Sequence, residues 1–243
     1  MSAAVLTDVT LLLGASDITS YTGSFDVGGE AAFKPARNFG AKGYEVLIPG
    51  VFTGTASLKG NADFASAAVS STFNSSAAGT QQALSIMPTG SAAAAGDTAT
   101  LLRGRLVSGR MAAGAVGETS TFELTMTTDD AEVDGYVAAP LASRTTAGLT
   151  GTAINIVGPS ASQKLYAALH ITAASGTNLA VKVQSDDNSG FTSPTDRITF
   201  TTVSATGWQW SSVAGNLATE TYWRAVATIA TGTFSFAVTF GVL

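Results

Sequence analysis

The sequence contains no cysteine and only one histidine, His170. The absence of cysteine excludes disulfides, thiolate metal sites and cysteine nucleophiles, and it fits assembly in a reducing cytoplasm. A single histidine cannot supply a His-based zinc site, and in YAALHITAA it is better explained as a strand residue between apolar neighbours than as part of a Ser-His-Asp triad. We therefore expect neither an enzyme nor a cofactor-binding protein.

Charged residues are also scarce, at 12% of 243 residues, and the chain has no apolar run long enough to span a membrane. Its N-terminal segment lacks the basic and then apolar order of a secretion signal, so we expect an unprocessed chain without membrane insertion. Glycine numbers 26 residues, and the abundant small and β-branched residues suit strands and tight turns. With so few charges, we expect neighbouring subunits to cover part of the surface.

The charge changes at one place along the chain. Residues 1–144 carry 8 Lys and Arg against 13 Asp and Glu, a net charge of −5, whereas residues 145–243 carry 4 of each kind. The intervening segment 144–153 is rich in threonine and glycine, as linkers often are. We therefore predict two domains, residues 1–145 and residues 146–243.

The first part is predicted to be mostly β. Alternating or apolar runs bounded by Gly, Asn and Pro indicate strands, and they cover residues 9–13, 23–33, 46–59, 98–111 and 119–127. Helical patterns cover residues 65–73 and 77–87, and the second ends before Pro88, whose ring would clash with a continuing helix. We expect a β-sandwich or barrel with one or two short helices.

The second part is predicted to contain strands alone. They cover residues 163–173, 178–185, 196–202, 208–213, 221–230 and 233–242. The turn signals between them have the spacing of an antiparallel sandwich, and the alternation of Phe234, Phe236, Val238 and Phe240 marks one apolar face. We expect an antiparallel β-sandwich, Ig-like or jelly-roll-like, that forms a surface domain.

Two groups of residues in the second part are candidate binding sites. Asp186, Asp187 and Asn188 share a turn and could offer oxygen ligands to calcium, although the EF-hand order is missing and solvated turn residues are the favoured explanation. Trp208 and Trp210 alternate on one strand face, and with Trp223 they could form a platform for a carbohydrate or part of the core.

Three segments in order resemble the tail-tube, or major tail, proteins of long-tailed, siphophage-like viruses. They are LLLGASDITSY, FKPARNFGAKGYEVLIPGVFTGTASLKGNADF and LLRGRLVSGRMAAGAVGETSTFELTMTTDD, which together extend over about residues 5–130. The resemblance implies a structural virion protein whose hexameric rings stack into the tube through which DNA passes during ejection. It also implies other tail proteins as partners, assembly in the host cytoplasm and a final place in the virion tail.

The resemblance assigns roles to two groups of residues. A loop from Lys34 to Tyr44 would contact the next ring, and its further residues are Arg37, Asn38 and Lys42. The predicted strand over residues 98–111 would pair between subunits, through Arg103, Arg105 and Arg110. Closing a ring removes exposed sheet edges, which makes such an assembly physically reasonable. Because DNA is a dense polyanion that binds basic surfaces, we expect an acidic or weakly charged lumen.

Two alternatives come from other classes of protein. A virion decoration or fibre protein would form trimers or bind capsid shells instead of forming tubes. A carbohydrate-binding or cell-surface-binding module in the second domain would use Trp208, Trp210 and Trp223 to stack on sugars.

Overall fold

A computed structural model describes residues 8–36, 46–62, 79–89, 93–113 and 118–243. Strands dominate these residues, and their one helical element is a short 3-10 turn, η1 (Thr19–Tyr21). The strands of the first part are β1 (Thr10–Leu13), β2 (Ser16–Asp17), β3 (Thr22–Ala36), β4 (Val46–Asn61), β5 (Gln81–Met87), β6 (Thr98–Ala113) and β7 (Thr121–Arg144). The predicted mostly β fold is confirmed.

The second part continues with shorter strands. They are β8 (Leu149–Thr150), β9 (Ile154–Asn155), β10 (Lys164–Ala174), β11 (Thr177–Asp186), β12 (Thr195–Thr199), β13 (Gly207–Ala214), β14 (Tyr222–Thr231) and β15 (Phe234–Val242). The six longer strands match the six predicted segments to within a few residues. Turn residues therefore mark the strand ends of this part reliably.

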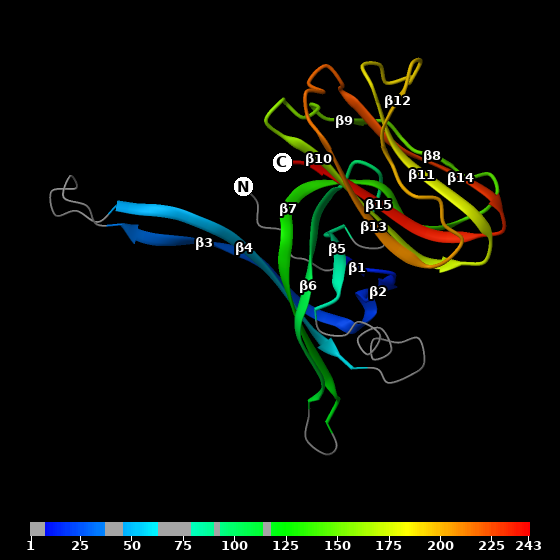
Figure 1. The fold of residues 1–243 in the computed structure, drawn as a ribbon. Coiled ribbons are helices and arrows are strands. Elements are labelled where there is room, and N and C mark those ends of the chain that lie inside the picture. Colours follow the sequence, from blue (N-terminus) through cyan, green and yellow to red (C-terminus); the bar gives the residue numbers. More distant parts are fainter. Residues whose placement is uncertain (1–7, 37–45, 63–78, 90–92, 114–117) are drawn as a thin grey trace. The chain divides into compact units, whose positions relative to one another are not determined.

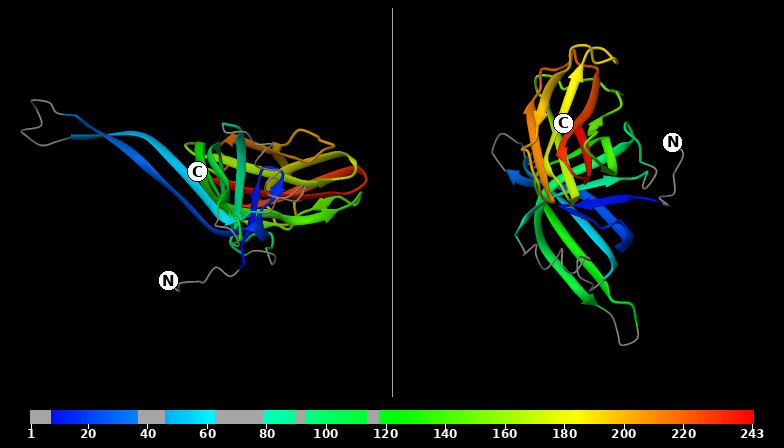
Figure 2. Two further views of the ribbon diagram at one scale, coloured as in Figure 1. Left: turned by 90° about the horizontal axis from the view of Figure 1, so that it is seen from below. Right: turned by 90° about the vertical axis from the view of Figure 1, so that its right-hand side faces the viewer.

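The strands form two sheets. One sheet has the order β13-β10-β15-β7-β6-β5-β1-β2, with β4 also paired to β7 and β3 paired to β4. The other has the order β12-β11-β14-β8, with β9 also paired to β14. The strands β10 to β15, yellow-green to red in Figures 1 and 2, make two facing layers. The predicted antiparallel sandwich is therefore present.

The core of the sandwich lies between these two layers. Phe234, Phe236, Val238 and Phe240 alternate along β15 and are completely buried, as their spacing predicts. The ring of Trp223 on β14 stacks on Phe240 at 6.1 Å between centroids. Each such side chain contributes roughly 1.5–3 kcal/mol when it is fully buried, so this layer of aromatic rings is a major source of stability.

Contacts divide the chain into two compact units. The first, here called the sandwich unit, comprises residues 1–20, 82–103 and 132–243; the second, the ribbon unit, comprises residues 21–81 and 104–131. Strands β6 and β7 contribute residues to both units. Within the sandwich unit, Tyr136 of β7 pairs with Phe240 of β15, so strand pairing crosses residue 145. The division into domains 1–145 and 146–243 stays a prediction.

The predicted helix over residues 77–87 is wrong for residues 81–87, which form β5. This strand pairs with β1, with Leu11 opposite Ile86 and Leu13 opposite Leu84. The five consecutive residues 83–87 are buried, and an apolar run buried on both faces does not show the period of two that distinguishes a strand. The other predicted helix, residues 65–73, lies outside the described residues. No helix in the described part of the chain is long and apolar enough to span a membrane.

Candidate assembly surface

Strands β3, β4, β7 and β6 lie side by side in this order in the ribbon unit, and the register of β3, β4 and β7 defines the polar face of the sheet. Lys59 of β4 lies opposite Ser24 of β3 and Glu123 of β7. Directly opposed residues project from the same face of a sheet. The next rows on this face are Asp26, Ser57 and Thr125, and then Gly28, Thr55 and Thr127. Small hydroxyl side chains and a few charges therefore cover the face.

The opposite face of the same sheet is apolar. Its first row is Phe25, Leu58 and Leu124, and its second row is Val27, Ala56 and Met126. The residues on β4 and β7 are at most 2% exposed, whereas Phe25 and Val27 on β3 are only half-buried. Burial of the apolar face is therefore least complete along β3.

Glycine allows the strands of this sheet to approach one another closely. The N–H of Gly54 donates to the hydroxyl of Thr128 at 2.9 Å, and this hydroxyl donates to the Gly54 carbonyl at 3.1 Å. A Cβ atom at Gly54 would lie 2.7 Å from the Thr128 hydroxyl oxygen, and one at Gly104 of β6 would lie 2.3 Å from the Thr127 carbonyl oxygen. At Gly104 only glycine fits without a shift of the backbone, and at Gly54 a Cβ atom would displace the Thr128 side chain and its hydrogen bonds.

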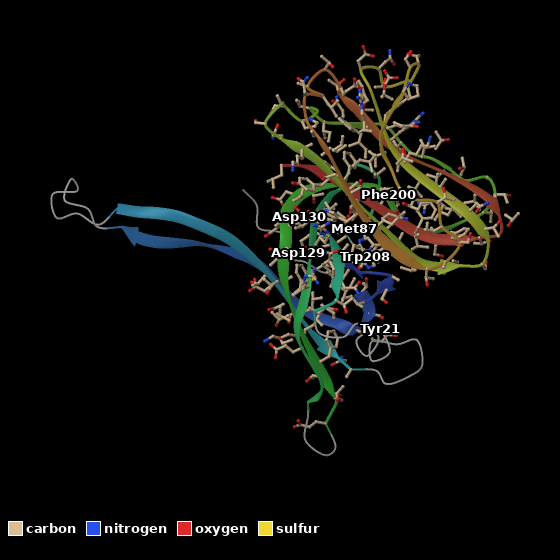
Figure 3. The ribbon with its side chains drawn as sticks, in the orientation of Figure 1. Tyr21, Met87, Asp129, Asp130, Phe200 and Trp208 are labelled. Carbon is tan, nitrogen blue, oxygen red and sulfur yellow. The ribbon has the colours of Figure 1, made fainter. Side chains whose placement is uncertain are left out.

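The charges on the polar face compensate one another. The Lys59 ammonium lies 2.8 Å from a carboxylate oxygen of Glu123, and the two side chains are 58% and 46% exposed. The Arg105 guanidinium lies 3.5 Å from the carboxylate of Asp129, which is labelled on β7 in Figure 3. With Asp26, the described side chains of this face carry two cations and three anions, a net charge of −1.

Further hydrogen bonds hold the pair formed by Arg105 and Asp129. Arg105 donates from Nη1 to the carbonyl of Gly79 at 2.8 Å, and the side-chain amide of Gln81 donates to Asp129 at 2.5 Å. The guanidinium therefore binds the segment that precedes β5 as well as the carboxylate on β7. These contacts fix the orientation of Arg105 before any second chain binds.

Strand β3 forms an edge of this sheet. It pairs with β4 over its length from Thr22 to Ala36, and none of the other described strands pairs with it. Figures 1 and 2 show these two strands side by side as a long ribbon, in blue and cyan. A long sheet edge presents backbone N–H and C=O groups to another chain, which is why monomeric proteins usually cover or shorten it. A strand of a second copy can pair here.

The three arginines predicted to lie between subunits all belong to β6. The guanidinium of Arg103 lies 6.0 Å from the ring centroid of Trp210, and Arg105 makes the contacts given above. Only the backbone of Arg110 is described. The predicted pairing of Arg103, Arg105 and Arg110 across subunits stays a prediction, because no partner chain is present.

The predicted inter-ring loop is mostly outside the described residues. Lys34 belongs to the end of β3, whereas Arg37, Asn38, Lys42 and Tyr44 lie outside the described part of the chain. Strands β3 and β4 do bracket this segment, since Ala36 pairs with Val46. Its role as a contact to the next ring stays a prediction.

The predicted tryptophan platform is wrong in one of its three members. Trp223 is 0% exposed in the sandwich core, and its Nε1 has no hydrogen-bond partner among the described residues. Trp208 and Trp210 lie on β13 and are half-buried, and the Trp210 ring packs 5.9 Å from that of Tyr166. Successive side chains of a strand point to opposite faces. On β14 the face of Trp223 is the buried one, whereas residues 222 and 224 lie on the other face.

The acidic turn predicted as a calcium candidate binds its own backbone. Asp186 accepts hydrogen bonds from the N–H groups of Asn188 at 3.1 Å and Ser193 at 2.9 Å. The bond from Ser193 is the main reason why the pKa of Asp186 is lowered, whereas the side-chain hydrogen bond to Asp186 raises the pKa of Asp187. No group of three His, Asp or Glu residues in the described part of the chain is placed to hold a metal.

Sequence reasoning missed a buried polar network in the sandwich unit. His170 is fully buried. Its Nδ1 lies 2.7 Å from the Gly14 carbonyl oxygen, and its Nε2 lies 2.8 Å from the Ser85 hydroxyl. The Ser85 hydroxyl lies 2.9 Å from the Thr239 hydroxyl. A carbonyl only accepts, so Nδ1 donates and the neutral ring accepts from Ser85 at Nε2. Burial lowers the pKa of His170 to about 4. A lone histidine in an apolar strand was the only sequence signal.

No family model matches the sequence, and no curated protein matches it. Among solved structures, a chain of the native gene transfer agent virion is 16% identical, with a TM-score of 0.39. The match covers 54% of the present chain and 97% of the virion chain. A chain of the phage SPP1 tail tube is 11% identical, with a TM-score of 0.43, and the match covers 54% of the present chain and 78% of the tail-tube chain. The SPP1 Dit protein, a hub of the adsorption apparatus, is 10% identical, with a TM-score of 0.39, and the match covers 97% of the present chain and 99% of the Dit chain. The similar solved chains thus include tail-tube and tail-hub proteins.

Proposed function

We propose that this chain is a structural subunit of a phage tail tube. Six copies close into a ring, and the rings stack into the conduit through which DNA passes during ejection. The observation that carries the proposal is the fifteen-residue edge strand β3 (Thr22–Ala36), which among the described strands pairs with β4 alone. A closed ring of subunits covers such an edge by pairing it with the next copy, and it leaves no exposed edge.

The polar face of the ribbon unit is the proposed lining of the conduit. It carries Lys59 and Arg105 against Asp26, Glu123 and Asp129, and its remaining positions are mostly serine and threonine. Duplex DNA binds basic surfaces with release of counterions. A face with a nearly neutral balance and short hydroxyl side chains offers DNA no such binding, so the DNA can slide through the tube.

The other proposed contacts connect the rings and the tail. The segment from Lys34 to Tyr44, at the far end of the β3–β4 ribbon, contacts the next ring in the stack. The particle assembles in the host cytoplasm with other tail proteins as partners, and the mature location is the virion tail. The role is structural, so no catalytic step is assigned to any residue.

Negative-stain microscopy and light scattering of the purified full-length chain test the assembly directly. The proposal predicts six-fold rings or tubes whose mass increases with protein concentration. A chain that stays monomeric at every concentration contradicts it. A trimer contradicts it as well and favours the alternative of a decoration or fibre protein.

The proposed lumen has a separate test that uses the absence of cysteine. A single Ser57→Cys substitution places a thiol on the polar face, and Thr228→Cys places one on the exposed surface of β14 as a matched control. We expect a bulky maleimide to label position 228 at the same rate in assembled tubes and in free subunits. At position 57 we expect labelling to be at least about tenfold slower in tubes than in free subunits. Equal labelling at both positions contradicts a polar face that lines the lumen.

A further inference from the structure

A cleft of about 690 Å³ opens in the sandwich unit. Its walls come from β7, from β9 and the residues that follow it, and from one end of the β10–β15 pair, where β10 begins and β15 ends. They include Asp134, Tyr136, Asn155, Val157, Gln163 and Val242. Volumes of 300–1,000 Å³ are typical of sites for small ligands. The cleft therefore has room for one or two sugar rings or a molecule of that size.

Backbone hydrogen bonds hold the cleft walls in place. Ile156 donates to the Thr221 carbonyl at 3.0 Å, and Gly158 donates to the Glu220 carbonyl at 2.9 Å. On the opposite wall the Tyr136 ring packs against that of Phe240 at 6.2 Å between centroids. Because the walls are ordered before binding, less conformational entropy of the protein is lost when a ligand binds.

The polar groups of the cleft can both donate and accept hydrogen bonds. The side-chain carbonyl of Gln163 accepts a hydrogen bond from the N–H of Ser160 at 3.0 Å. The NH₂ group of the same side chain can donate to a ligand. Asn155 is exposed and offers an amide donor and an acceptor. The carboxylate of Asp134, which accepts the Thr100 hydroxyl at 3.3 Å, adds acceptor positions. Pairs of ligand hydroxyls match this set, because each hydroxyl donates and accepts.

Apolar side chains lie beside these polar groups. Val157 is 74% exposed, and it is one of three large apolar side chains in the described part of the chain that are mostly exposed. A second, Leu243, is 54% exposed and directly follows Val242 of the cleft wall. Exposed apolar groups at a cleft often take part in binding. Val157 and the Tyr136 ring both line the cleft and offer apolar contacts for the C–H face of a ligand.

Among the described residues that line the cleft, the one charged residue is Asp134, which supplies a carboxylate. Partial burial, together with repulsion from Asp134, raises the pKa of the neighbouring Glu132. A ligand that carries phosphate, sulfate or carboxylate groups is repelled here, whereas a neutral polyhydroxyl ligand is not.

We propose that this cleft is a binding site for a neutral carbohydrate. The amides of Asn155 and Gln163 and the carboxylate of Asp134 bind ring hydroxyls, while Tyr136 and Val157 contact the C–H face. The site differs from the predicted tryptophan platform, whose Trp223 is buried in the core. It is independent of the proposed tube assembly, because none of its residues belongs to the ribbon unit.

The test begins with the full-length protein and a panel of neutral oligosaccharides, namely maltotriose, cellotriose, chitotriose and a galactan trisaccharide. Saturation-transfer NMR at concentrations up to about 10 mM detects even weak binding. We expect binding of at least one neutral sugar and none of its sulfated analogue. If no neutral sugar binds, or if the sulfated analogue binds equally well, the proposal is wrong.

Two exposed positions then locate the binding site without disturbing the fold. Asn155→Ala and Val157→Ser should each weaken binding about threefold to tenfold, as the loss of one hydrogen bond or one apolar contact predicts. Thr228→Ala, at an exposed position on β14 outside the cleft, should leave the affinity unchanged. Sugar binding that survives both cleft substitutions contradicts this site, and the assembly of the same variants into rings shows separately whether the tube proposal holds.

Discussion

The sandwich unit and the ribbon unit differ in how completely their strands are buried. In the sandwich unit β15 has buried residues on both faces, with Phe236 and Phe240 on one and Ala237 and Thr239 on the other, and Trp223 of β14 is 0% exposed. In the ribbon unit β4 and β7 bury one face and expose the other, and β3 buries neither Phe25 nor Val27 completely. The first arrangement stabilises a subunit by itself, whereas the second leaves surface that another subunit can cover.

This difference indicates a division of tasks between the units. Stability should depend mainly on the aromatic core and the buried network of the sandwich unit. Assembly should depend mainly on the edge and the faces of the ribbon unit. Substitutions chosen in each unit separate the two properties.

The largest loss of stability is expected from Trp223→Ala. Removing a large buried aromatic side chain leaves a cavity and costs about 3–5 kcal/mol. Trp223→Phe should cost less, because it keeps a ring and removes an Nε1–H that has no partner among the described residues. Urea unfolding of both variants measures the difference. A loss below about 1 kcal/mol for Trp223→Ala would contradict the importance of this core.

The second effect is a pH dependence of the sandwich unit. Folded His170 has a pKa of about 4, whereas an unfolded histidine titrates near 6.5, so the unfolded chain binds more protons between these values. The stabilisation by neutral His170 is complete above pH 6.5 and is lost as the pH falls towards 4, by roughly 3 kcal/mol. Urea midpoints measured across this range should fall more steeply in the native protein than in His170→Gln. Parallel curves would show that His170 does not titrate as proposed.

The third effect should appear in assembly and hardly in stability. Val27→Lys places a charge on the half-buried apolar side of the edge strand β3, a substitution that disfavours edge pairing. We expect the concentration needed for ring formation to increase at least about tenfold, with unfolding changed by less than about 1 kcal/mol. Thr228→Lys on β14 is the control with the same added charge. Light scattering that shows equal assembly of both variants would remove β3 from the interface.

The smallest effect is expected from the pair of Lys59 and Glu123. Both side chains are about half exposed, so Lys59→Ala should change stability by less than about 1 kcal/mol. The change should become smaller still in 1 M salt, which screens exposed charges. A loss of several kcal/mol at any salt concentration would mean that the polar face contributes to stability as the sandwich core does.

The two units also differ in how well the sequence predicts them. In the sandwich, turn residues such as Asp187, Asn188 and Gly190 separate strands of regular length, and the alternation of Phe234 and Phe236 marks the buried face. Near residue 84 the prediction is wrong, because a strand buried on both faces shows no alternation. The 24-residue strand β7 also extends far beyond the predicted residues 119–127, since its acidic segment from Asp129 to Asp134 resembles a turn.

The candidate sites were less predictable, because they depend on contacts between distant parts of the chain. The sequence groups Trp208, Trp210 and Trp223 as a possible platform, and only the burial of Trp223 in the structure shows that its ring lies in the core. The network of Gly14, Ser85 and His170 joins three segments far apart in sequence. The cleft around Tyr136 and Asn155 has no local motif, since each of its walls contributes only a few ordinary residues.

Hydrogen exchange compared between free subunits and assembled particles tests the division of tasks most directly. We expect the backbone amides of residues 23–29 on β3 that point away from β4 to become protected on assembly, because a strand of the next copy binds them. Amides of β10 and β15 should be equally protected in both states, because their partners lie in the same subunit. Protection that increases in the sandwich strands while β3 stays unchanged would contradict the account.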